Sequence, residues 1–302
     1  MHYLITGGTG SLGRELVKVF TKEGHDVTIL SRDPHKQASL INEYPMVRAI
    51  LADVRDYASV LNACRGVHFV VHAAALKRVE LGETNPDEYF SVNVGGTRNV
   101  AEAAATCDVR HALLISTDKA PAPANLYGVT KKLAESVWLN KSNGHTAFSA
   151  VRYGNVMDSN GGVWSVWQER IKRGLPLVVR EPEPTRFCMR KVDAVALVRS
   201  TLLKMQGGEI FVPYGVPAFS LWNLAREMEP DEDKWIIEPL GPGEKQHEIL
   251  VAPTEYVEKA YDDVWRVLPR RTVRSQCVPM IFQSERARRL TGAEVVKLLE
   301  GT

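Results

Sequence analysis

The sequence predicts an α/β protein built on a doubly wound parallel sheet, with a smaller, interleaved C-terminal lobe that we expect to bind substrate. Short apolar runs alternate with helix-length segments as far as residue 150, the pattern of strand–helix–strand units in a parallel sheet. A glycine-rich turn follows the first apolar run and opens the first helix. Together these two observations indicate a Rossmann-type, dinucleotide-binding fold.

The composition limits the class of protein. The 302 residues are 44% hydrophobic, enough for one or two domains with a large core. The 38 Lys and Arg residues nearly balance 36 Asp and Glu residues, which argues against a general nucleic-acid binder. Four scattered cysteines form no CxxC pair and no metal-ligand spacing. Because no stretch approaches the roughly 20 apolar residues of a membrane span, and the N-terminus does not resemble a signal peptide, we expect a cytoplasmic protein without metal.

The first strand, helix and turn predict the pyrophosphate site. A strand is expected over Tyr3–Thr6 and a helix over Arg14–Lys22, with glycines between them in the spacing G-x-x-G-x-x-G. Gly7 permits a tight turn, Gly10 lets the backbone approach a pyrophosphate, and Gly13 lets the helix pack on the strand. The helix N-terminus then faces the phosphates, whereas the alternative is an ordinary glycine-rich turn. The predicted cofactor-binding residues here are Gly7, Thr9, Gly10, Ser11, Leu12 and Gly13.

The end of the second strand predicts the choice of dinucleotide. This strand is expected over Asp26–Leu30 and is followed by Ser31 and Arg32, with Lys36 close behind. An NAD site usually has an acid at this strand end, on the ribose 2′-hydroxyl. A small hydroxyl and a guanidinium suit a 2′-phosphate instead, so NADP is favoured. Asp33 keeps NAD open, and a solvated basic loop is the alternative interpretation.

Residues after the third and fourth strands are predicted to contact the adenine and nicotinamide ends of the cofactor. Strands are expected over Arg48–Leu51 and Val67–Ala73. Asp53 follows the first of these strands and can accept a hydrogen bond from an adenine amine, or it can cap a helix. Small residues after the latter leave room for the cofactor across the strand ends. The predicted cofactor contacts are Asp53, Val54, Ala73, Ala74 and Ala75.

The fifth strand and the helix after it carry the predicted chemistry. Tyr127 and Lys131 are four residues apart and share one helix face, where the lysine can tune the phenol and hold a ribose hydroxyl. Asp118 and Lys119 follow a buried strand expected over His111–Ile115. A Tyr/Lys pair suffices for hydride transfer, so the second acid–amine pair indicates that a proton is also removed from carbon and an oxygen protonated. The alternatives are an exposed helix pair and a surface ion pair.

The remaining chain predicts a second, interleaved unit. A further strand is expected over Thr146–Val151, and buried Asn93 is expected to bridge backbone groups near the site. We predict a cofactor domain over 1–152. Residues 153–302 then form mainly the substrate lobe, with about 185–205 returning to the first domain.

The glycine motif with Tyr127 and Lys131 resembles the extended short-chain dehydrogenase/reductase superfamily. Finer motifs resemble the inverting UDP-N-acetylglucosamine 4,6-dehydratases over most of the chain. These motifs are Ala73–Lys77, Asn85-Pro86, Ser116–Ala120, Asn125–Gly128, Arg152–Val156, Thr185–Phe187 and Gly243–Glu248. One departure is Gly241, where that family typically has an arginine.

The resemblance implies a function, a substrate and an assembly. It implies conversion of UDP-N-acetylglucosamine, or a close UDP-hexose, to a 4-keto-6-deoxy sugar for surface glycans. It also implies retained NADP and a homo-oligomer, dimeric or larger. By the same resemblance and their charge or polarity, the predicted substrate-binding residues are Lys77, Asn155, Arg186 and Glu244.

The predicted catalytic residues then take separate roles. Tyr127 removes the proton of the carbon-4 hydroxyl, while Lys131 lowers the phenol pKa and positions the ribose. Lys119, neutral through desolvation, removes the carbon-5 proton. Asp118, protonated, gives its proton to the departing carbon-6 hydroxyl. Thr117 hydrogen-bonds the carbon-4 oxygen.

Two other functions compete with this hypothesis. A nucleotide-sugar epimerase or ketoreductase of the same fold needs Tyr127 and Lys131 but has no use for Lys119. A non-catalytic NADP-binding regulator needs the glycines alone, and the complete catalytic set counts against it.

Overall fold

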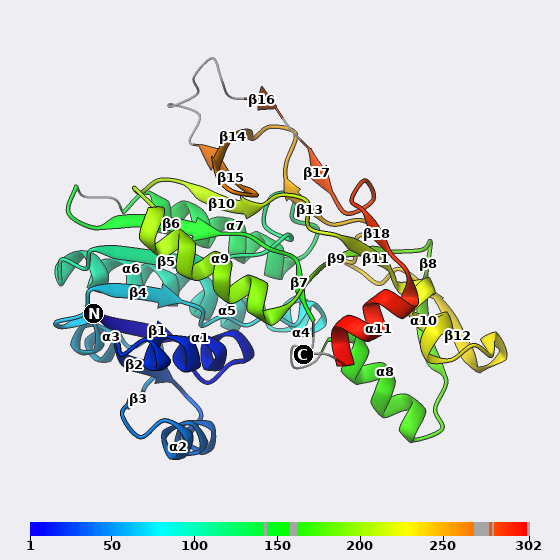
Figure 1. Cartoon of the computed structure of the whole chain (residues 1–302), viewed down its shortest axis with the longest axis horizontal. Coiled ribbons are helices and arrows are strands. Elements are labelled where there is room, and N and C mark those ends of the chain that lie inside the picture. The colour runs from blue at the N-terminus through cyan, green and yellow to red at the C-terminus, as the bar shows by residue number, and fades with distance from the viewer. Residues whose placement is uncertain (142–143, 158–161, 269–277, 280, 301–302) are drawn as a thin grey trace.

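A ten-stranded sheet forms the centre of the protein (Figure 1). The computed structural model describes residues 1–141, 144–157, 162–268, 278–279 and 281–300. The sheet has the order β16-β14-β15-β10-β6-β5-β4-β1-β2-β3. Its strands are β1 (His2–Thr6), β2 (Asp26–Ser31), β3 (Arg48–Leu51), β4 (Phe69–His72), β5 (His111–Ile115), β6 (Ala147–Val151), β10 (Ile210–Pro213), β14 (Tyr256–Tyr261), β15 (Val264–Leu268) and β16 (Val278–Pro279).

The sheet is parallel from β3 to β10, and β15, β14 and β16 continue it antiparallel. The strand order 3-2-1-4-5-6 confirms the predicted doubly wound, Rossmann-type architecture. The apolar runs of the sequence become β1, β4 and β5, whose inner residues are buried on both faces as a parallel sheet requires.

Helices cover both faces of this sheet. α1 packs beside α9 on one face, and α3, α6 and α7 lie together on the other (Figure 1). The helices of this part are α1 (Ser11–Lys22), α2 (Pro34–Glu43), α3 (Tyr57–Cys64), α4 (Val79–Thr84), α5 (Pro86–Phe90), the π-helix η1 (Ser91–Gly96), α6 (Thr97–Thr106), α7 (Leu126–Leu139) and α9 (Lys191–Lys204).

A small lobe flanks the carboxyl edge of the sheet and has its own apolar core. It contains a four-stranded sheet of order β18-β11-β9-β7 and the pairs β12-β8 and β13-β17. Its elements are β7 (Asn155–Val156), α8 (Val163–Lys172), β8 (Leu177–Glu181), β9 (Thr185–Met189), β11 (Ala218–Ser220), α10 (Leu221–Met228), the 3₁₀ helix η2 (Glu232–Lys234), β12 (Trp235–Pro239), β13 (Ile249–Val251), β17 (Phe282–Gln283), β18 (Arg289–Leu290) and α11 (Gly292–Glu300).

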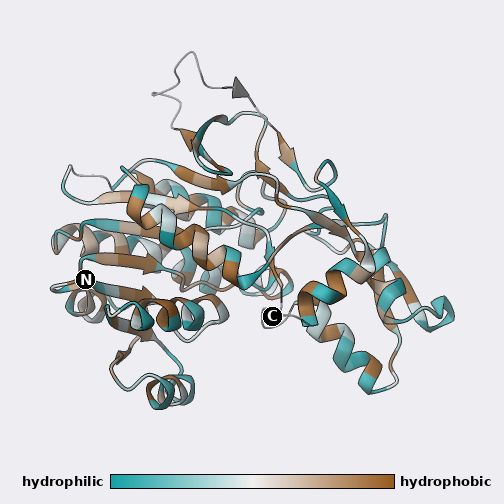
Figure 2. Ribbon diagram, in the orientation of Figure 1, coloured by the Kyte–Doolittle hydropathy of each residue, from teal (hydrophilic) through white to brown (hydrophobic). Residues whose placement is uncertain are grey.

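The two halves are more interleaved than the sequence indicates. α9 packs on α1 and on the main sheet, within the predicted returning segment of about 185–205. β10, β14 and β15 also join the main sheet, although they lie beyond that segment. Figure 2 shows the central strands largely hydrophobic. Among the described residues, none of the helices has the length and apolarity that a bilayer span would need.

Candidate active site

A cleft of about 770 Å³ lies where the carboxyl edge of the main sheet meets the small lobe. Its walls are formed by the glycine-rich turn, the residues after β5, the first turns of α7 and loops of the lobe. The predicted residues that line it are Gly7, Gly10, Ser11, Leu12, Gly13, Ala73, Ala75, Lys77, Thr117, Asp118, Lys119, Tyr127, Lys131, Asn155, Arg186 and Glu244. This is the edge at which ligands bind in open parallel sheets.

The glycine-rich turn has the geometry of a pyrophosphate cradle. Gly7 has φ +71°, a conformation that favours glycine. A Cβ on Gly13 would lie 2.5 Å from the Gly7 carbonyl oxygen, so a side chain there would force the helix away from the turn. Gly10 is the N-cap of α1 and provides no capping side chain, which leaves the first amides of the helix directed at the cleft. These residues fit a dinucleotide.

The end of β2 lies beside the start of the cleft and presents Ser31 and Arg32. Ser31 is buried, and its hydroxyl accepts a hydrogen bond from Gln37 Nε2 at 3.0 Å. Arg32 is half exposed and its Nη1 lies 3.4 Å from Asp53 Oδ2. Asp33 caps α2 by accepting from the Lys36 amide, so this acid is engaged at the helix start.

Asp53 belongs to a surface cluster rather than to a helix cap. Its Oδ1 accepts from the Arg55 amide at 2.9 Å, and its Oδ2 lies 2.7 Å from Arg55 Nη2. Asp56, not Asp53, caps α3. Val54 is buried against Gly96, where an added Cβ would lie 2.5 Å from Val54 Cγ2. The structure therefore gathers the predicted adenosine residues at the ends of β2 and β3, outside the lining of the cleft itself.

Tyr127 and Lys131 lie one turn apart on α7, and both side chains are buried. Asn125 starts this helix by accepting from the Gly128 amide at 2.7 Å. Lys131 Nζ donates to the Ile115 carbonyl oxygen at 2.6 Å, which fixes the ammonium at the end of β5. Burial lowers the pKa of Lys131 to about 8.

The pKa of the Tyr127 phenol is set differently from the prediction. Burial raises the pKa of Tyr127 to about 12, and the charge that opposes this shift most is that of Lys119. The predicted lowering of the phenol pKa by the charge of Lys131 is therefore not the dominant effect in this arrangement. The ammonium that favours the phenolate most is that of Lys119, from the second pair.

Asp118 and Lys119 meet a third charged residue, Glu248. Lys119 Nζ lies 3.1 Å from Asp118 Oδ1 and 2.9 Å from Glu248 Oε1. Both carboxyl groups are buried, at 1% and 2% exposure. Burial favours a neutral amine, but these two carboxylates outweigh it and hold the pKa of Lys119 above its usual value. The prediction that desolvation leaves Lys119 neutral is wrong for this state of the site.

Asp118 has the environment expected of a protonated acid. Burial raises its pKa above the usual value, although the adjacent Lys119 opposes the shift. Its Oδ1 accepts from the Thr117 hydroxyl at 3.0 Å. Its Oδ2 is buried and has no hydrogen-bond partner among the residues that the structure describes. A proton on Oδ2 would be held ready for an acceptor in the cleft.

The predicted substrate residues lie around the same charged cluster. Arg186 Nη1 donates to backbone oxygens of Thr185 and Gln246, and its Nε lies 4.0 Å from Glu248 Oε1. Lys77 lines the opposite wall, where partial desolvation lowers the pKa of its amine. The predicted Asn155 is the first residue of β7 and also lines the cleft.

Glu244 supports a loop of the lobe. Its Oε2 accepts from the Gly241 amide at 2.7 Å and lies 3.1 Å from Arg180 Nε. Gly241 is the position at which the dehydratase family typically has an arginine. Arg180, from β8, brings a guanidinium to this loop.

The prediction of catalytic residues missed Glu248 and Tyr153. Both line the cleft, and burial raises the pKa of Tyr153 above its usual value. Glu248 lies within the Gly243–Glu248 motif, so its type and position were visible in the sequence. No spacing rule, however, links it to a lysine 129 positions earlier. The predicted role of Asn93 is confirmed, because its side chain bonds both the amide and the carbonyl oxygen of Leu76, at 2.8 and 3.0 Å.

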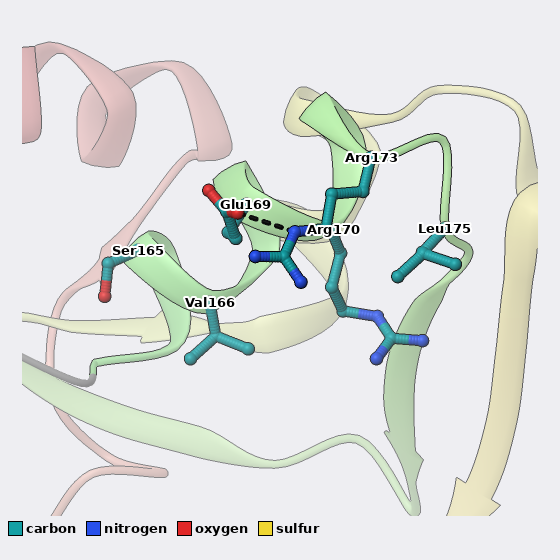
Figure 3. A pocket seen from close by; sticks show the side chains of 6 residues that line it. All are labelled: Ser165, Val166, Glu169, Arg170, Arg173 and Leu175. Carbon is teal, nitrogen blue, oxygen red and sulfur yellow. Dashed lines mark hydrogen bonds and ion pairs between the residues drawn. The ribbon is translucent and has the colours of Figure 1, made fainter.

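A second hollow, of about 340 Å³, lies on the outer side of α8 (Figure 3). Glu169 and Arg173 form an ion pair across one helical turn there, and Arg170 donates to the Pro176 carbonyl oxygen. These charges satisfy one another at the surface, so we place the chemistry in the larger cleft.

Comparison with known proteins gives one family. The family model described as polysaccharide biosynthesis protein matches residues 3–268. The inverting UDP-N-acetylglucosamine 4,6-dehydratase of Campylobacter jejuni is 36% identical over 277 residues, covering 88% of this chain and 82% of that protein. The UDP-glucose 4-epimerase of Rickettsia rickettsii is 39% identical over 281 residues, covering 87% and 82%.

Solved structures agree with the fold. The crystal structure of Pen from Bacillus thuringiensis matches with a TM-score of 0.91 and 29% identity, covering 99% of this chain and 97% of that one. DesIV, a dTDP-glucose 4,6-dehydratase from Streptomyces venezuelae solved with NAD, matches with a TM-score of 0.73 over 82% of this chain and 87% of that one. At 18% identity the second likeness concerns the fold alone.

Proposed function

The chain belongs to the polysaccharide biosynthesis protein family of extended short-chain dehydrogenase/reductases, and from this we propose that it is a nucleotide-sugar 4,6-dehydratase. Its substrate would be UDP-N-acetylglucosamine or a close UDP-hexose, and its product a 4-keto-6-deoxy sugar for surface glycan biosynthesis. The observation that carries the proposal is the buried pair of Asp118 and Lys119, which faces the same cleft as Tyr127 and Lys131. Oxidation at carbon 4 passes no proton to or from this pair, whereas loss of water across carbons 5 and 6 needs both a proton acceptor and a proton donor.

We propose NADP as the dinucleotide, with NAD as the alternative. The glycine-rich turn and the start of α1 would hold the pyrophosphate. Ser31 and Arg32 at the end of β2 suit a 2′-phosphate, and Asp33 is engaged as a helix cap instead of facing a ribose. The NAD bound to DesIV keeps the alternative open. A bound dinucleotide would supply the hydride acceptor for carbon 4 and the hydride donor for carbon 6.

Tyr127 and Thr117 act at carbon 4. The phenolate of Tyr127 takes the proton of the carbon-4 hydroxyl, and the Lys119 ammonium facing the phenol favours that charged form. Thr117 hydrogen-bonds the same oxygen and holds it in line. Lys131, fixed by the Ile115 carbonyl oxygen, keeps its charge near the reacting oxygen and positions the ribose.

Asp118 and Lys119 act at carbons 6 and 5 and share one proton. Moving that proton from Lys119 Nζ to Asp118 Oδ1 across 3.1 Å makes a neutral amine and a protonated acid in a single step. The amine then removes the carbon-5 proton, while the acid protonates the departing carbon-6 hydroxyl. After water has left, the pair is an ammonium and a carboxylate again, the arrangement that the structure shows.

The test uses purified protein and UDP-N-acetylglucosamine without added cofactor. We expect a product lighter by one water, with no net reduction of dinucleotide, by mass spectrometry and near-ultraviolet absorbance. An unchanged mass with a new epimer in the proton NMR spectrum would replace the proposal by an epimerase, the activity named for the Rickettsia relative. Unaltered sugar together with bound NADP would favour a non-catalytic regulator. The homo-oligomer and the cytoplasmic location stay predictions.

A further inference from the structure

Glu248 is a buried charged residue of the cleft to which the proposed reaction gives no role. It lies just before β13, on a segment that reaches the cleft from the small lobe. Its Oε1 is 2.9 Å from Lys119 Nζ, and its Oε2 is 2.9 Å from Lys245 Nζ. Arg186 Nε adds a third positive charge at 4.0 Å. A carboxylate with three cations around it and 2% exposure is held as an anion.

The backbone around Glu248 is fixed by buried hydroxyl groups. The Glu248 amide donates to Ser284 Oγ at 2.9 Å, and the Ser284 amide donates back to the Glu248 carbonyl oxygen at 2.9 Å. Thr185 Oγ1 lies 2.8 Å from Ser284 Oγ and 2.8 Å from His247 Nδ1. Thr185 and Ser284 are at most 1% exposed. The backbone at Glu248 is therefore held by β9 and the segment at residue 284, independently of Lys119.

We propose that Glu248 is a positioning residue, the permanent counter-ion of Lys119, which frees Asp118 to carry the proton that the departing hydroxyl receives. The proposal rests on the dehydratase function above. Two carboxyl groups compete for one ammonium, and the one with more cations around it stays ionised. Glu248 faces Lys119, Lys245 and Arg186, whereas among the described residues Asp118 forms an ion pair with Lys119 alone.

The titration of the cluster agrees with this division. The ammonium groups of Lys119 and Lys245 overcome burial and hold the pKa of Glu248 at about 2. The pKa of Asp118 is raised by burial, and the charge of Glu248 adds to the rise. The charged groups facing Lys119 are Asp118 beside it, Glu248 before β13 and Arg186 on β9, and the Tyr127 phenol faces it from α7.

Replacing Glu248 by Gln should lower two pKa values, those of Lys119 and Asp118. Loss of the carboxylate lowers the pKa of Lys119, because an attractive charge is removed. It also lowers the pKa of Asp118, because a repulsive charge is removed. The active form needs a neutral Lys119 and a protonated Asp118, so the limbs of the pH profile that these two groups set move to lower pH, whereas the fall above about pH 8 that Lys131 sets does not move. Removing a carboxylate in direct contact shifts a pKa by about 1–3 units.

The experiment measures kcat and KM against pH for the full-length wild type and Glu248→Gln. We expect the optimum of kcat to fall by about one pH unit or more, with KM little changed. Glu285→Gln is the matched control, since Glu285 is 52% exposed, pairs with His247 and does not line the cleft. A lower rate at an unmoved optimum would show a merely structural role and overturn the proposal.

Two further variants keep the test decisive. In a Lys119→Met background, Glu248→Gln should move only the limb of the pH profile that Asp118 sets, to lower pH, because the limb that Lys119 sets is lost. A profile that Glu248→Gln leaves in place in that background would overturn the proposal. If Glu248→Gln does not fold, Ser284→Ala loosens the same carboxylate and should shift the optimum in the same direction by less. An inactive wild type would instead refute the dehydratase function, so the two failures are distinguishable.

Discussion

Replacing Asp118 by Asn should lower activity while leaving the fold as stable or more stable. The Asn side chain has the same shape, so it can keep the contacts of Oδ1 with Thr117 and Lys119, at 3.0 and 3.1 Å. It cannot donate an acidic proton to the departing hydroxyl. A general acid contributes about a hundred- to ten-thousand-fold in rate, which corresponds to about 3–5 kcal/mol of activation free energy.

The stability of this variant follows from the raised pKa of Asp118. A carboxyl whose pKa is higher in the folded protein than its unfolded value of 3.8 stabilises the fold fully only below that value. This contribution is lost as the pH rises through the folded pKa. The ionised carboxylate of Asp118 therefore destabilises the fold at neutral pH. Asn carries no such charge, and Lys119 keeps Glu248 as its counter-ion.

The assay combines turnover by mass spectrometry with thermal unfolding at neutral and at acidic pH. We expect the unfolding midpoint of Asp118→Asn to equal or exceed that of the wild type at neutral pH, and the two to converge under acidic conditions. Asp193→Asn is the control, because its exposed ion pair with Arg190 is worth little. A variant that keeps its activity within tenfold, or one that melts several degrees lower at neutral pH, would refute the reasoning.

Three further predictions follow from other parts of the cleft and its support. Activity should fall as the pH rises through about 8, because Lys131 then loses its ammonium. From there to its unfolded value of 10.5 the unfolded chain binds more protons, so the unfolding midpoint should rise. A rate that stays constant well above pH 8 would contradict this. Arg32→Ala should weaken NADP by about ten- to a hundredfold and NAD far less in binding titrations, since a charged hydrogen bond is worth about 1.5–3 kcal/mol; an equal loss for both would exclude Arg32 from the 2′ site. Arg152→Leu should cost about 3–5 kcal/mol in denaturant unfolding, because the buried Glu135 would lose the guanidinium 2.7 Å away. A loss below about 1 kcal/mol would show that the pair is dispensable.

The parts of the fold that could be predicted are those that depend on sequence patterns within a few neighbouring residues. The alternation of strand and helix, the positive φ of Gly7 and the close approach of Gly13 to Gly7 all depend on residues only a few positions apart. The sequence could not place β10, β14 and β15 in the main sheet, because their pairing depends on partners far along the chain. Asn93 lies on the π-helix η1 and bonds Leu76 and Thr130, contacts between elements that no local pattern specifies.

The charged residues of the site show the same limit more sharply. Burial of Asp118 could be predicted from its place after an apolar strand, and its pKa is indeed raised. The sign for Lys119 was predicted wrongly because burial was counted without the second carboxylate, Glu248, which arrives from the other lobe. Desolvation is a property of one position and can be estimated from local pattern. A Coulombic interaction needs the distance between two positions, and sequence spacing does not provide it.

The distinction between dehydratase and epimerase depends on energetics more than on percentage identity. The two named relatives differ by only a few per cent in identity to this chain, 36% against 39%. Burying Asp118, Lys119 and Glu248 together is costly even when they are paired, and apolar side chains of similar volume are often as stable or more so. Hydride transfer at carbon 4 alone uses Tyr127 as its base and needs no second proton acceptor or donor. A proton acceptor and a proton donor in contact are, in contrast, what removal of water from adjacent carbons requires.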